Sequence, residues 1–206
     1  MYFKDINHYG DRGLIIDFGI ESSKDVSQEI NAAIIYLKDL KLPTLNTIPS
    51  YNKIVLYFEN TEEKQKSIKT LEIKMKDFRP LDIKRPYKRW NIPACYDPQY
   101  ALDFERIQKL HDLSNLEIIN LHTKKIYYNY YIGFMPGFPY LGEIPSKLIT
   151  PRLSSPRLQI PARSVGIAKE HTCIYPKTSP GGWNIIAQVP FDIFSLDHSR
   201  TSLFLP

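Results

Sequence analysis

The sequence is poor in the residues that metal sites, disulfide frameworks and membrane spans require. It has only two cysteines, Cys95 and Cys173, far apart and without CxxC spacing, a pattern that favours buried reduced thiols over a disulfide or a zinc site. No run approaches the roughly 20 apolar residues of a membrane helix. The first residues, MYFKDINHYGDRG, contain no apolar signal-peptide core. We therefore expect a cytoplasmic protein with no metal and no membrane partner.

Self-contained catalytic signatures are also missing. The five histidines form no HxxxH or HExxH pair, and the chain has neither a GxSxG elbow nor a GxxxxGK[ST] phosphate loop. His122, in NLHTKK at a predicted helix end, is either a structural residue that bonds local carbonyls or an acid or base. His171, in KEHTC, resembles a turn residue. Neither histidine predicts a catalytic triad.

The net charge of +5 raises the possibility of nucleic-acid binding. Its local source is KMKDFRPLDIKRPYKRW, residues 74–90, where cations alternate with Tyr87 and Trp90. From Lys84 onward this stretch is typical of an extended strand with charges on its solvent face. Since no nucleic-acid module signature is present, we expect no nucleic-acid partner.

The first 90 residues alternate between strand and helix patterns. GLIIDF (13–18) predicts a strand, and the segment 21–41 has apolar residues at helical spacing, with Ser22 or Ser23 as its cap. TLNTIPS and KIVLYF then predict a hairpin around Tyr51-Asn52, followed by a second helix capped by Thr61 and a strand beginning near Lys84. This β-α-β-β-α-β order predicts a ferredoxin-like α+β domain over residues 1–90.

The pattern of predicted secondary structure changes after Trp90. Two short helices are predicted first, the second with a capping box from Ser114 to Glu117. Short β-favouring runs broken by proline and glycine follow: KIYYNYYIGF, RLQIP, SVGIAK, TCIYP and WNIIAQVP. Such a pattern favours a β-barrel or sandwich over a parallel sheet, and we place this second domain at residues 91–206.

One aromatic stretch, YIGFMPGFPYLG (131–142), holds three of the nine glycines of the chain. Pro136-Gly137 suits positions i+1 and i+2 of a type II turn, and at Phe138-Pro139 a cis bond is an open alternative. A loop of this kind presents Phe134, Phe138 and Tyr140 at little entropic cost. The rings either close a core or line a binding surface.

Two further segments also combine proline or glycine with cationic or aromatic side chains. Pro151-Arg152 and Pro156-Arg157 place guanidinium groups beside rigid corners, where each either holds a carboxylate or phosphate or pairs with loop carbonyls and surface acids. SPGGW is either an anion-binding turn beside Tyr175 or a tight turn whose Trp183 side chain packs in the hydrophobic core. Because three separate loops share this chemistry, we predict that they form one cleft. The candidate substrate-binding residues are Phe134, Pro136, Gly137, Phe138, Tyr140, Arg152, Arg157, Tyr175, Ser179, Gly181, Gly182, Trp183 and Asn184, with His122 and Arg163 as possible additions.

At these residues the sequence resembles the family that includes allophanate hydrolase subunit 1, the 5-oxoprolinase subunit PxpB and the sporulation-kinase inhibitor KipI. The resemblance covers nearly the whole chain, through YGDRGLIIDFG, IPSYNKIVLYF, IPACYD, LHT, GFMPGFPYLG, TPRLSSPR, IPARSVGIA and IYPKTSPGGWNII. It implies a ferredoxin-like N-terminal domain and a cyclophilin-like β-barrel C-terminal domain. Relatives usually have glycine where this chain has Arg163, so an arginine side chain there could fill the cleft.

The resemblance also implies partners. It points to the PxpB-type subunit of an ATP-dependent 5-oxoprolinase, inactive alone, that works with a subunit 2 (PxpC-like) protein and a lactam-utilisation (PxpA-like) protein, with ATP as co-substrate of the complex. The alternative is a KipI-like inhibitor that binds a sensor histidine kinase. A prolyl isomerase is suggested only by the cyclophilin-like barrel, and no matching active-site motif supports it.

Overall fold

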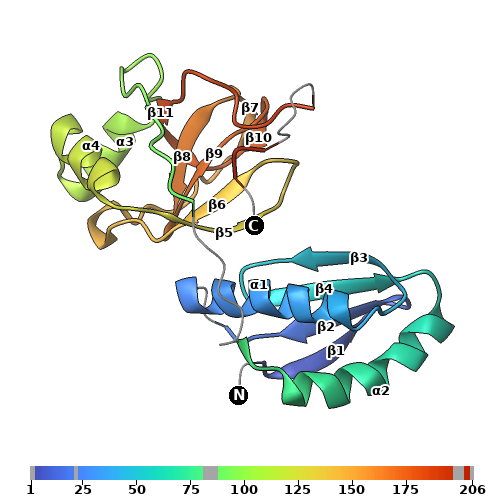
Figure 1. Cartoon of the computed structure of the whole chain (residues 1–206). Helices are drawn as coiled ribbons and strands as arrows, with labels where there is room; N and C mark the ends of the chain where they lie inside the picture. The colour runs from blue at the N-terminus through green and yellow to red at the C-terminus, as the bar shows by residue number, and fades with distance from the viewer. Residues whose placement is uncertain (1–2, 21–22, 81–87, 197–201, 205–206) are drawn as a thin grey trace. The chain divides into compact units, whose positions relative to one another are not determined.

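A computed structural model describes residues 3–20, 23–80, 88–196 and 202–204. The chain divides into two compact units, Met1–Lys88 and Arg89–Pro206 (Figure 1). Each unit has its own apolar core. No helix in the described ranges is long and apolar enough to cross a membrane.

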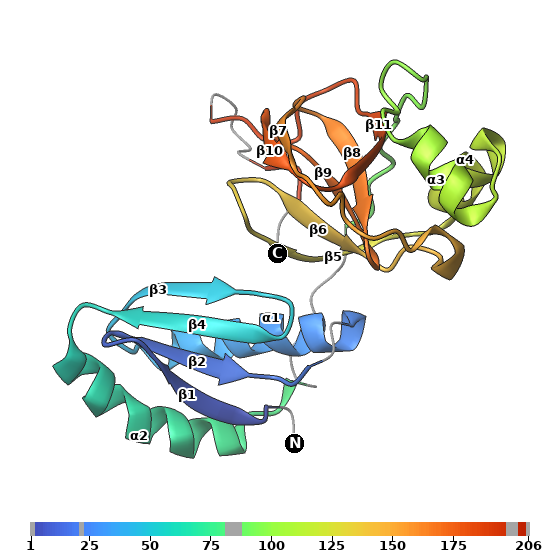
Figure 2. The ribbon, with the colours of Figure 1, turned by 180° about the vertical axis from the view of Figure 1, so that it is seen from behind.

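The first unit is a four-stranded antiparallel sheet with two helices on one face. The strands β1 (Asp5–Tyr9), β2 (Gly13–Asp17), β4 (Lys53–Phe58) and β3 (Thr44–Pro49) lie side by side in that order. The helix α1 (Lys24–Asp39) connects β2 to β3, and α2 (Thr61–Asp77) follows β4. Seen from behind, the strands lie in front of α1 (Figure 2).

Alternation along β4 explains why this sheet buries one face. Ile54, Leu56 and Phe58 are buried, whereas the residues between them are partly exposed. Successive strand side chains point to opposite faces, so the buried set faces the helices. It packs in one cluster with Ala33 of α1 and Leu71 of α2.

The predictions of the helix caps in this unit are confirmed in part. Ser23 caps α1 and accepts a hydrogen bond from the Val26 amide at 3.2 Å, as expected. The cap of α2 is Asn60, not Thr61, because the Asn60 side chain accepts from the Glu63 amide at 2.9 Å.

The strand predicted from Lys84 is tested only in part, and one other strand of this unit was missed. Residues 84–87 of the strand expected from Lys84 lie outside the described residues, and residues 88–94 form no strand. The sheet edge beside β2 is instead taken by β1, which sequence analysis missed. Of its five residues only Ile6 is partly buried, so β1 has no apolar alternation to reveal it.

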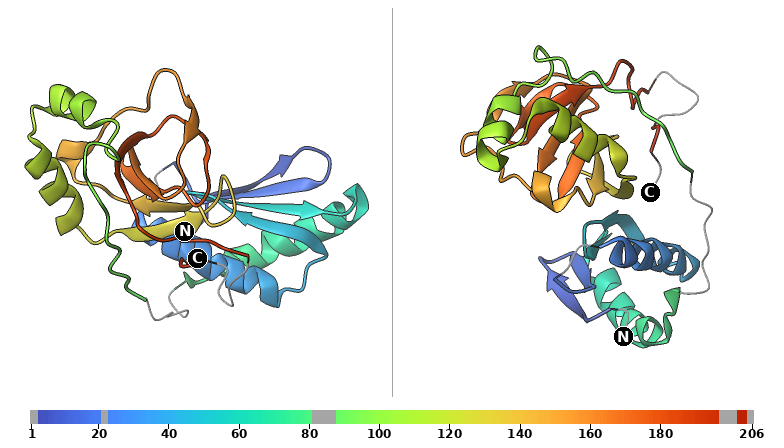
Figure 3. Two further views of the ribbon diagram at one scale, coloured as in Figure 1. Left: turned by 90° about the horizontal axis from the view of Figure 1, so that it is seen from above. Right: turned by 90° about the vertical axis from the view of Figure 1, so that its left-hand side faces the viewer.

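The second unit combines two short helices with two antiparallel sheets, which confirms the mixed α+β class. The helices α3 (Phe104–His111) and α4 (Asn115–Lys124) lie together beside the strands (Figure 3). The larger sheet has the order β11 (Asn184–Gln188), β8 (Ser164–Ala168), β9 (His171–Ile174), β6 (Pro139–Gly142) and β5 (Tyr128–Ile132). The smaller sheet pairs β10 (Ser179–Gly181) with β7 (Arg157–Ile160), and a 3-10 helix spans Ser146–Leu148.

Both faces of the larger sheet are buried. The residues Leu141, Ile167 and Ile174 belong to the main core with Ile107 of α3 and Ile118 of α4. Their neighbours on the opposite face form a second cluster: Phe138, Ile160, Ala168, Cys173, Tyr175, Trp183 and Ile185. Most of the candidate cleft residues belong to this second cluster or border it, but His122 and the Arg163 side chain do not.

Local predictions in this unit had mixed outcomes. The capping box is confirmed, since Ser114 and Glu117 exchange hydrogen bonds with each other's backbone amides. Both cysteines are free, as predicted, but only Cys173 is buried and Cys95 is exposed. The prediction that both thiols are interior was therefore wrong for Cys95.

Candidate functional site

The loop between β5 and β6 is held by its own backbone. The Phe138 amide donates to the Met135 carbonyl at 3.1 Å, and Gly137 has a φ of +77°. These are the features of the predicted type II turn. The Gly133 amide also donates to the Phe138 carbonyl at 3.1 Å, which closes the loop at its base. The Phe138-Pro139 bond is trans, so the cis alternative was wrong.

Phe134 at the tip of this loop has an unusual conformation. Its φ is +67°, and the Met135 amide donates across it to the Gly133 carbonyl at 2.8 Å. A γ-turn with positive φ is rare and strained for a residue with a side chain. The Phe134 ring is 65% exposed and lies edge-on to Phe138, with 5.4 Å between centroids. The fold therefore holds an apolar ring at the surface in a costly conformation.

Aromatic rings from three separate segments meet around Phe138. Its centroid is 5.0 Å from that of Tyr140, 5.1 Å from Tyr175 and 6.0 Å from Trp183. Phe138 and Tyr175 are fully buried, whereas Tyr140 is partly exposed. The rings thus form a core whose outer side reaches the surface, which combines the two alternatives left open by the sequence.

Tyr175 joins this cluster to the SPGGW segment. Its phenol interacts with the Trp183 backbone amide, and a side chain at Gly181 would place a Cβ 2.5 Å from the phenol oxygen. Only glycine, which has no Cβ, allows the backbone at position 181 to lie this close to the Tyr175 hydroxyl. Burial raises the pKa of Tyr175 and also that of Tyr140. Both phenols are therefore neutral hydrogen-bonding groups at physiological pH.

Arg152 lies at the exposed rim of the cluster. A Cβ at Gly182 would be 3.4 Å from its Nε and 3.5 Å from Nη2, so the guanidinium lies alongside the glycine backbone. Its charge acts to lower the pKa values of Tyr140 and Tyr175 against the larger effect of burial. Arg152 is thus close to both phenols.

Arg157 has a different environment. Its Nη1 and Nη2 donate to the two carboxylate oxygens of Asp103 at 3.0 and 2.7 Å. Asp103 is buried and also accepts from the Ile185 amide at 2.6 Å. This geometry corresponds to the alternative in which the arginine pairs with an acid, and it joins β7 to β11 and to the start of α3.

Asn184 is completely buried and has three hydrogen bonds within the unit. Its Nδ2 donates to the carbonyls of Pro151 at 3.0 Å and Ile167 at 3.1 Å, and its Oδ1 accepts from Arg106 Nε at 3.0 Å. The side chain therefore has no surface at which to contact a ligand. Its position supports the Arg152 segment instead.

His122 occupies the main core and not the aromatic cluster. The Tyr96 hydroxyl lies 2.7 Å from its Nδ1, and its Nε2 lies 3.1 Å from Thr172 Oγ1, which donates onward to the Gly166 carbonyl. Since the Thr172 hydroxyl proton is committed, we assign the imidazole proton to Nε2. Burial lowers the pKa of His122 to about 4. Of the two roles open to it from the sequence, His122 therefore has the structural one.

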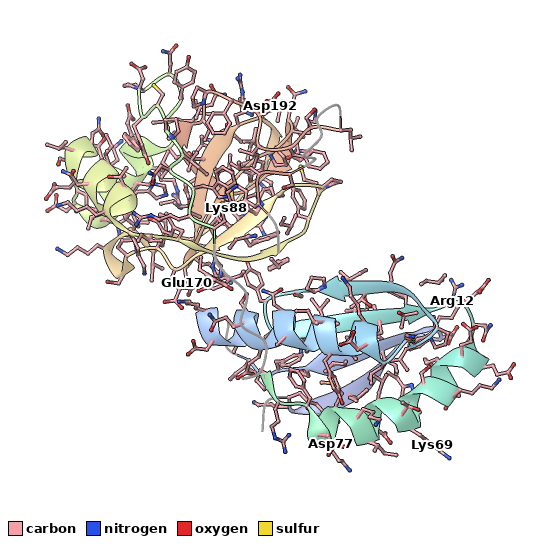
Figure 4. The ribbon with its side chains drawn as sticks, viewed as in Figure 1. Arg12, Lys69, Asp77, Lys88, Glu170 and Asp192 are labelled. Atoms are coloured by element: carbon pink, nitrogen blue, oxygen red, sulfur yellow. The ribbon has the colours of Figure 1, made fainter. Side chains whose placement is uncertain are left out.

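Arg163 has a φ of +69° in the turn before β8. Its side chain extends toward the Pro190 carbonyl at 3.4 Å and the Asp192 carboxylate at 3.9 Å. Figure 4 labels Asp192 and Glu170 at opposite ends of this unit. The side chain is directed toward the segment after β11, and no described contact links it to Arg152 or Trp183, so the expectation that it fills the cleft was wrong.

Ser179 lies in β10 opposite Ile160. Its hydroxyl oxygen is buried and has no hydrogen-bond partner among the described residues. Its neighbour Gly181 pairs with Arg157 on the same strands. Ser179 is therefore close to the cluster but belongs to its supporting sheet.

Three polar residues around the site were missed by sequence analysis. Asp103 holds the Arg157 side chain, and Arg106 holds that of Asn184. The only sequence signal for Asp103 was its position as an acidic residue just before a predicted helix. His171 was interpreted as a turn residue, but it begins β9 and is buried. The register pairs Gly142 with His171 and Tyr140 with Cys173, which puts His171 on the same sheet face as Tyr140.

A surface hollow is present elsewhere in this unit, between α3 and α4. It is lined by Glu105, Gln108, Lys109, Asp112, Leu113, Ser114 and Glu117. None of these residues was a candidate ligand. The described part of the chain contains no group of three His, Cys, Asp or Glu residues placed to hold a metal ion.

Comparison with known proteins places the chain among carboxyltransferase-type proteins. The family model described as carboxyltransferase domain, subdomain C and D, matches residues 4–204, and the chain belongs to this family. The B subunit of 5-oxoprolinase from Bacillus subtilis is 34% identical over 200 residues, covering 92% of this chain and 83% of the relative. The Haemophilus influenzae protein of the same name is 39% identical over 132 residues, covering 64% of this chain and 59% of that protein.

Solved structures resemble the chain in the same way. The protein TTHA0988 matches with a TM-score of 0.80 and 29% identity over 95% of this chain, which spans 38% of that longer protein. PH0987 from Pyrococcus horikoshii matches with a TM-score of 0.56 and 31% identity, covering 98% of this chain and 93% of that one. The Kluyveromyces lactis urea carboxylase matches with a TM-score of 0.72 at 15% identity, a likeness of fold alone.

Proposed function

We propose that the chain is the PxpB-type subunit of an ATP-dependent 5-oxoprolinase. The proposal depends above all on the exposed Arg152, which lies alongside Gly182 and acts electrostatically on the Tyr140 and Tyr175 phenols. The similarity to proteins named as the B subunit of 5-oxoprolinase supports this reaction. A surface that binds a small polar ring without completing the chemistry fits one subunit of a shared active site.

In this proposal the residues have separate tasks. Arg152, Gly182 and Tyr140 contact the substrate. Phe134, Pro136, Gly137 and Phe138 give the neighbouring wall its shape, and Tyr175, Ser179, Gly181, Trp183, Asn184 and Arg157 support it. A preformed wall reduces the ordering entropy lost on binding. His122 and Arg163 are assigned no contact with substrate.

The remaining machinery is assigned to partners. We propose a subunit 2 (PxpC-like) protein and a lactam-utilisation (PxpA-like) protein, with ATP as co-substrate of the assembled complex. No residue of this chain is assigned to ATP. Because ATP and the remaining catalytic groups are assigned to the partners, the chain alone is proposed to be inactive.

The fold fits the same proposal. We propose that residues 1–90 form a ferredoxin-like domain, because β2, α1, β3, β4 and α2 have the split order in which β4 lies between β2 and β3. We propose that residues 91–206 form a cyclophilin-like β-barrel, because two antiparallel sheets share the cluster around Phe138. No feature of the described residues favours the kinase-inhibitor alternative over the enzyme subunit.

Reconstitution tests the proposal. The chain is purified alone and with its presumed partners, and ATP-dependent release of glutamate from 5-oxoproline is measured. Activity is expected only when all components are present. Full activity of the lone chain, or none from any combination, contradicts the proposal.

A further inference from the structure

The two Pro-Arg steps differ in whether the guanidinium already has an anion. Arg157 is paired with Asp103, whereas the ion pairs of the described residues include none for Arg152. We infer that Arg152 is the anion-binding subsite of this surface and that it takes the carboxylate of a small-ring substrate. This inference rests on the proposed function and assigns one of its contacts.

The backbone of Arg152 is fixed on both sides. The preceding carbonyl, of Pro151, accepts from Asn184 Nδ2 at 3.0 Å, and the following amide, of Leu153, donates to the Gly182 carbonyl at 2.8 Å. Pro151 also restricts the chain before the arginine. The base of the side chain is therefore held in place, and less entropy is lost when the guanidinium binds an anion.

The surroundings of the guanidinium suit a carboxylate. Gly182 has no side chain to cover Nε and Nη2 of Arg152, so the guanidinium group can form two hydrogen bonds with one carboxylate. Tyr140 is neutral and partly exposed, and its hydroxyl already takes part in a hydrogen bond with Tyr131, so the phenol is a polar group held in place beside the charge. The partly exposed Tyr140 ring, which stacks on the buried Tyr131 ring with centroids 4.5 Å apart, adds apolar surface on this side of the unit. A carboxylate attached to a small flat ring matches this combination.

A phosphate has the same hydrogen-bonding chemistry as a carboxylate, so the source of the anion has to be separated by experiment. The aromatic face favours the carboxylate, because an apolar surface adds nothing to the binding of free phosphate. Three probes distinguish the cases: 5-oxoproline, the carboxylate-free lactam 2-pyrrolidinone, and inorganic phosphate.

The test compares Arg152→Ala with the matched variant Lys177→Ala, which removes an exposed cation two residues after Tyr175. Probe binding to the full chain is followed by NMR chemical shifts, and the KM for 5-oxoproline is measured in the assembled complex. Arg152→Ala should weaken 5-oxoproline binding or raise KM at least tenfold. Lys177→Ala should change either value less than twofold. Added guanidinium ion should restore part of the loss in Arg152→Ala only.

The probes also decide the class of anion. We expect 2-pyrrolidinone to bind weakly and equally to wild type and Arg152→Ala, since it has no charge for the arginine. Arginine-dependent binding of phosphate without binding of 5-oxoproline overturns the carboxylate assignment. Unchanged affinity and KM in Arg152→Ala, or absence of 5-oxoproline binding to both chain and complex, overturns the subsite itself. A wild-type complex that binds 5-oxoproline through Arg152 but releases no glutamate contradicts only the proposed reaction.

Discussion

Pro151-Arg152 and Pro156-Arg157 are the same dipeptide five residues apart, yet the fold uses them differently. Arg157 forms a bidentate pair with a buried carboxylate and joins three elements. Arg152 is exposed beside a glycine and two phenols. The difference teaches that an arginine in a rigid corner is fixed in the fold when a buried acid faces it and stays exposed when none does.

The largest effect on stability is expected at the paired arginine. Arg157→Ala leaves the Asp103 carboxylate buried with the Ile185 amide as its remaining donor among the described contacts, and removing one member of such a pair costs about 3 kcal/mol. Urea unfolding of the isolated chain measures the loss. Arg152→Ala is the matched control and should change the free energy of unfolding by less than about 0.5 kcal/mol. Equal losses in the two variants would remove the distinction between the arginines.

The buried His122 makes the stability of this unit depend on pH. Its folded pKa of about 4 lies below the ordinary value of 6.5, so the fold favours the neutral imidazole. The stability contributed by the neutral His122 is therefore fully present above about pH 6.5 and is lost as the pH falls toward 4. The free energy of unfolding decreases by about 3 kcal/mol over this range. His171 contributes in the same direction, since burial lowers its pKa as well.

Unfolding by urea at several pH values between 7 and 4 measures this dependence. His122→Gln should be less stable than wild type at pH 7 but should show a flatter pH profile. His171→Gln serves as the control that removes only the second contribution. A pH profile that is unchanged in His122→Gln contradicts the neutral buried imidazole.

An intermediate effect is expected in the aromatic loop. Gly137 has a φ of +77°, and a Cβ there would lie 2.4 Å from Phe194 Cβ. Gly137→Ala should destabilise the unit by about 2 kcal/mol, because the conformation is unfavourable for alanine and Phe194 has to move. Thermal unfolding checks the value, with Pro136→Ala as a milder control in the same turn. A loss below about 0.5 kcal/mol in Gly137→Ala would show that the loop is not held as described.

The smallest effect is expected at the half-buried Arg163. Its φ of +69° is costly for a side chain, and its two polar contacts are long and partly exposed. Arg163→Gly should therefore raise the free energy of unfolding by up to about 1 kcal/mol. Arg163→Ala keeps the strained backbone and should give no gain. Destabilisation of Arg163→Gly by more than about 1 kcal/mol would assign the side chain a stabilising role that these contacts do not explain.

Local patterns predicted much of the fold. Periodicity and capping residues located α1, α2 and α4 and most of the core strands, since these signals are carried by neighbouring residues. β1, β6 and β10 were missed: β1 is mostly exposed, β6 lies in the stretch that was interpreted as a loop, and β10 has three residues, SPG, with no strand pattern. β1 pairs with β2, which follows three residues later, whereas β10 pairs with the more distant strand β7.

The candidate site was predicted to a similar extent. The aromatic rings and Arg152 were identified from rigid Pro-Gly chemistry, and the structure brings these residues together. Asp103 and Arg106 could not be identified from sequence, because their partners Arg157 and Asn184 lie 54 and 78 residues away along the chain. Long-range pairs of this kind leave no local pattern.

By itself the sequence determined the turn at Pro136-Gly137, the capping box at Ser114 and the alternation that buries one face of β4, since backbone preferences and periodicity act over a few residues. Only the tertiary structure decided which of two identical Pro-Arg steps is paired, which ring of the aromatic loop is exposed, and that His122 is buried and neutral. Those outcomes depend on which distant acid, ring or hydroxyl the fold brings within hydrogen-bonding or van der Waals distance, and a single stretch of sequence does not contain that information.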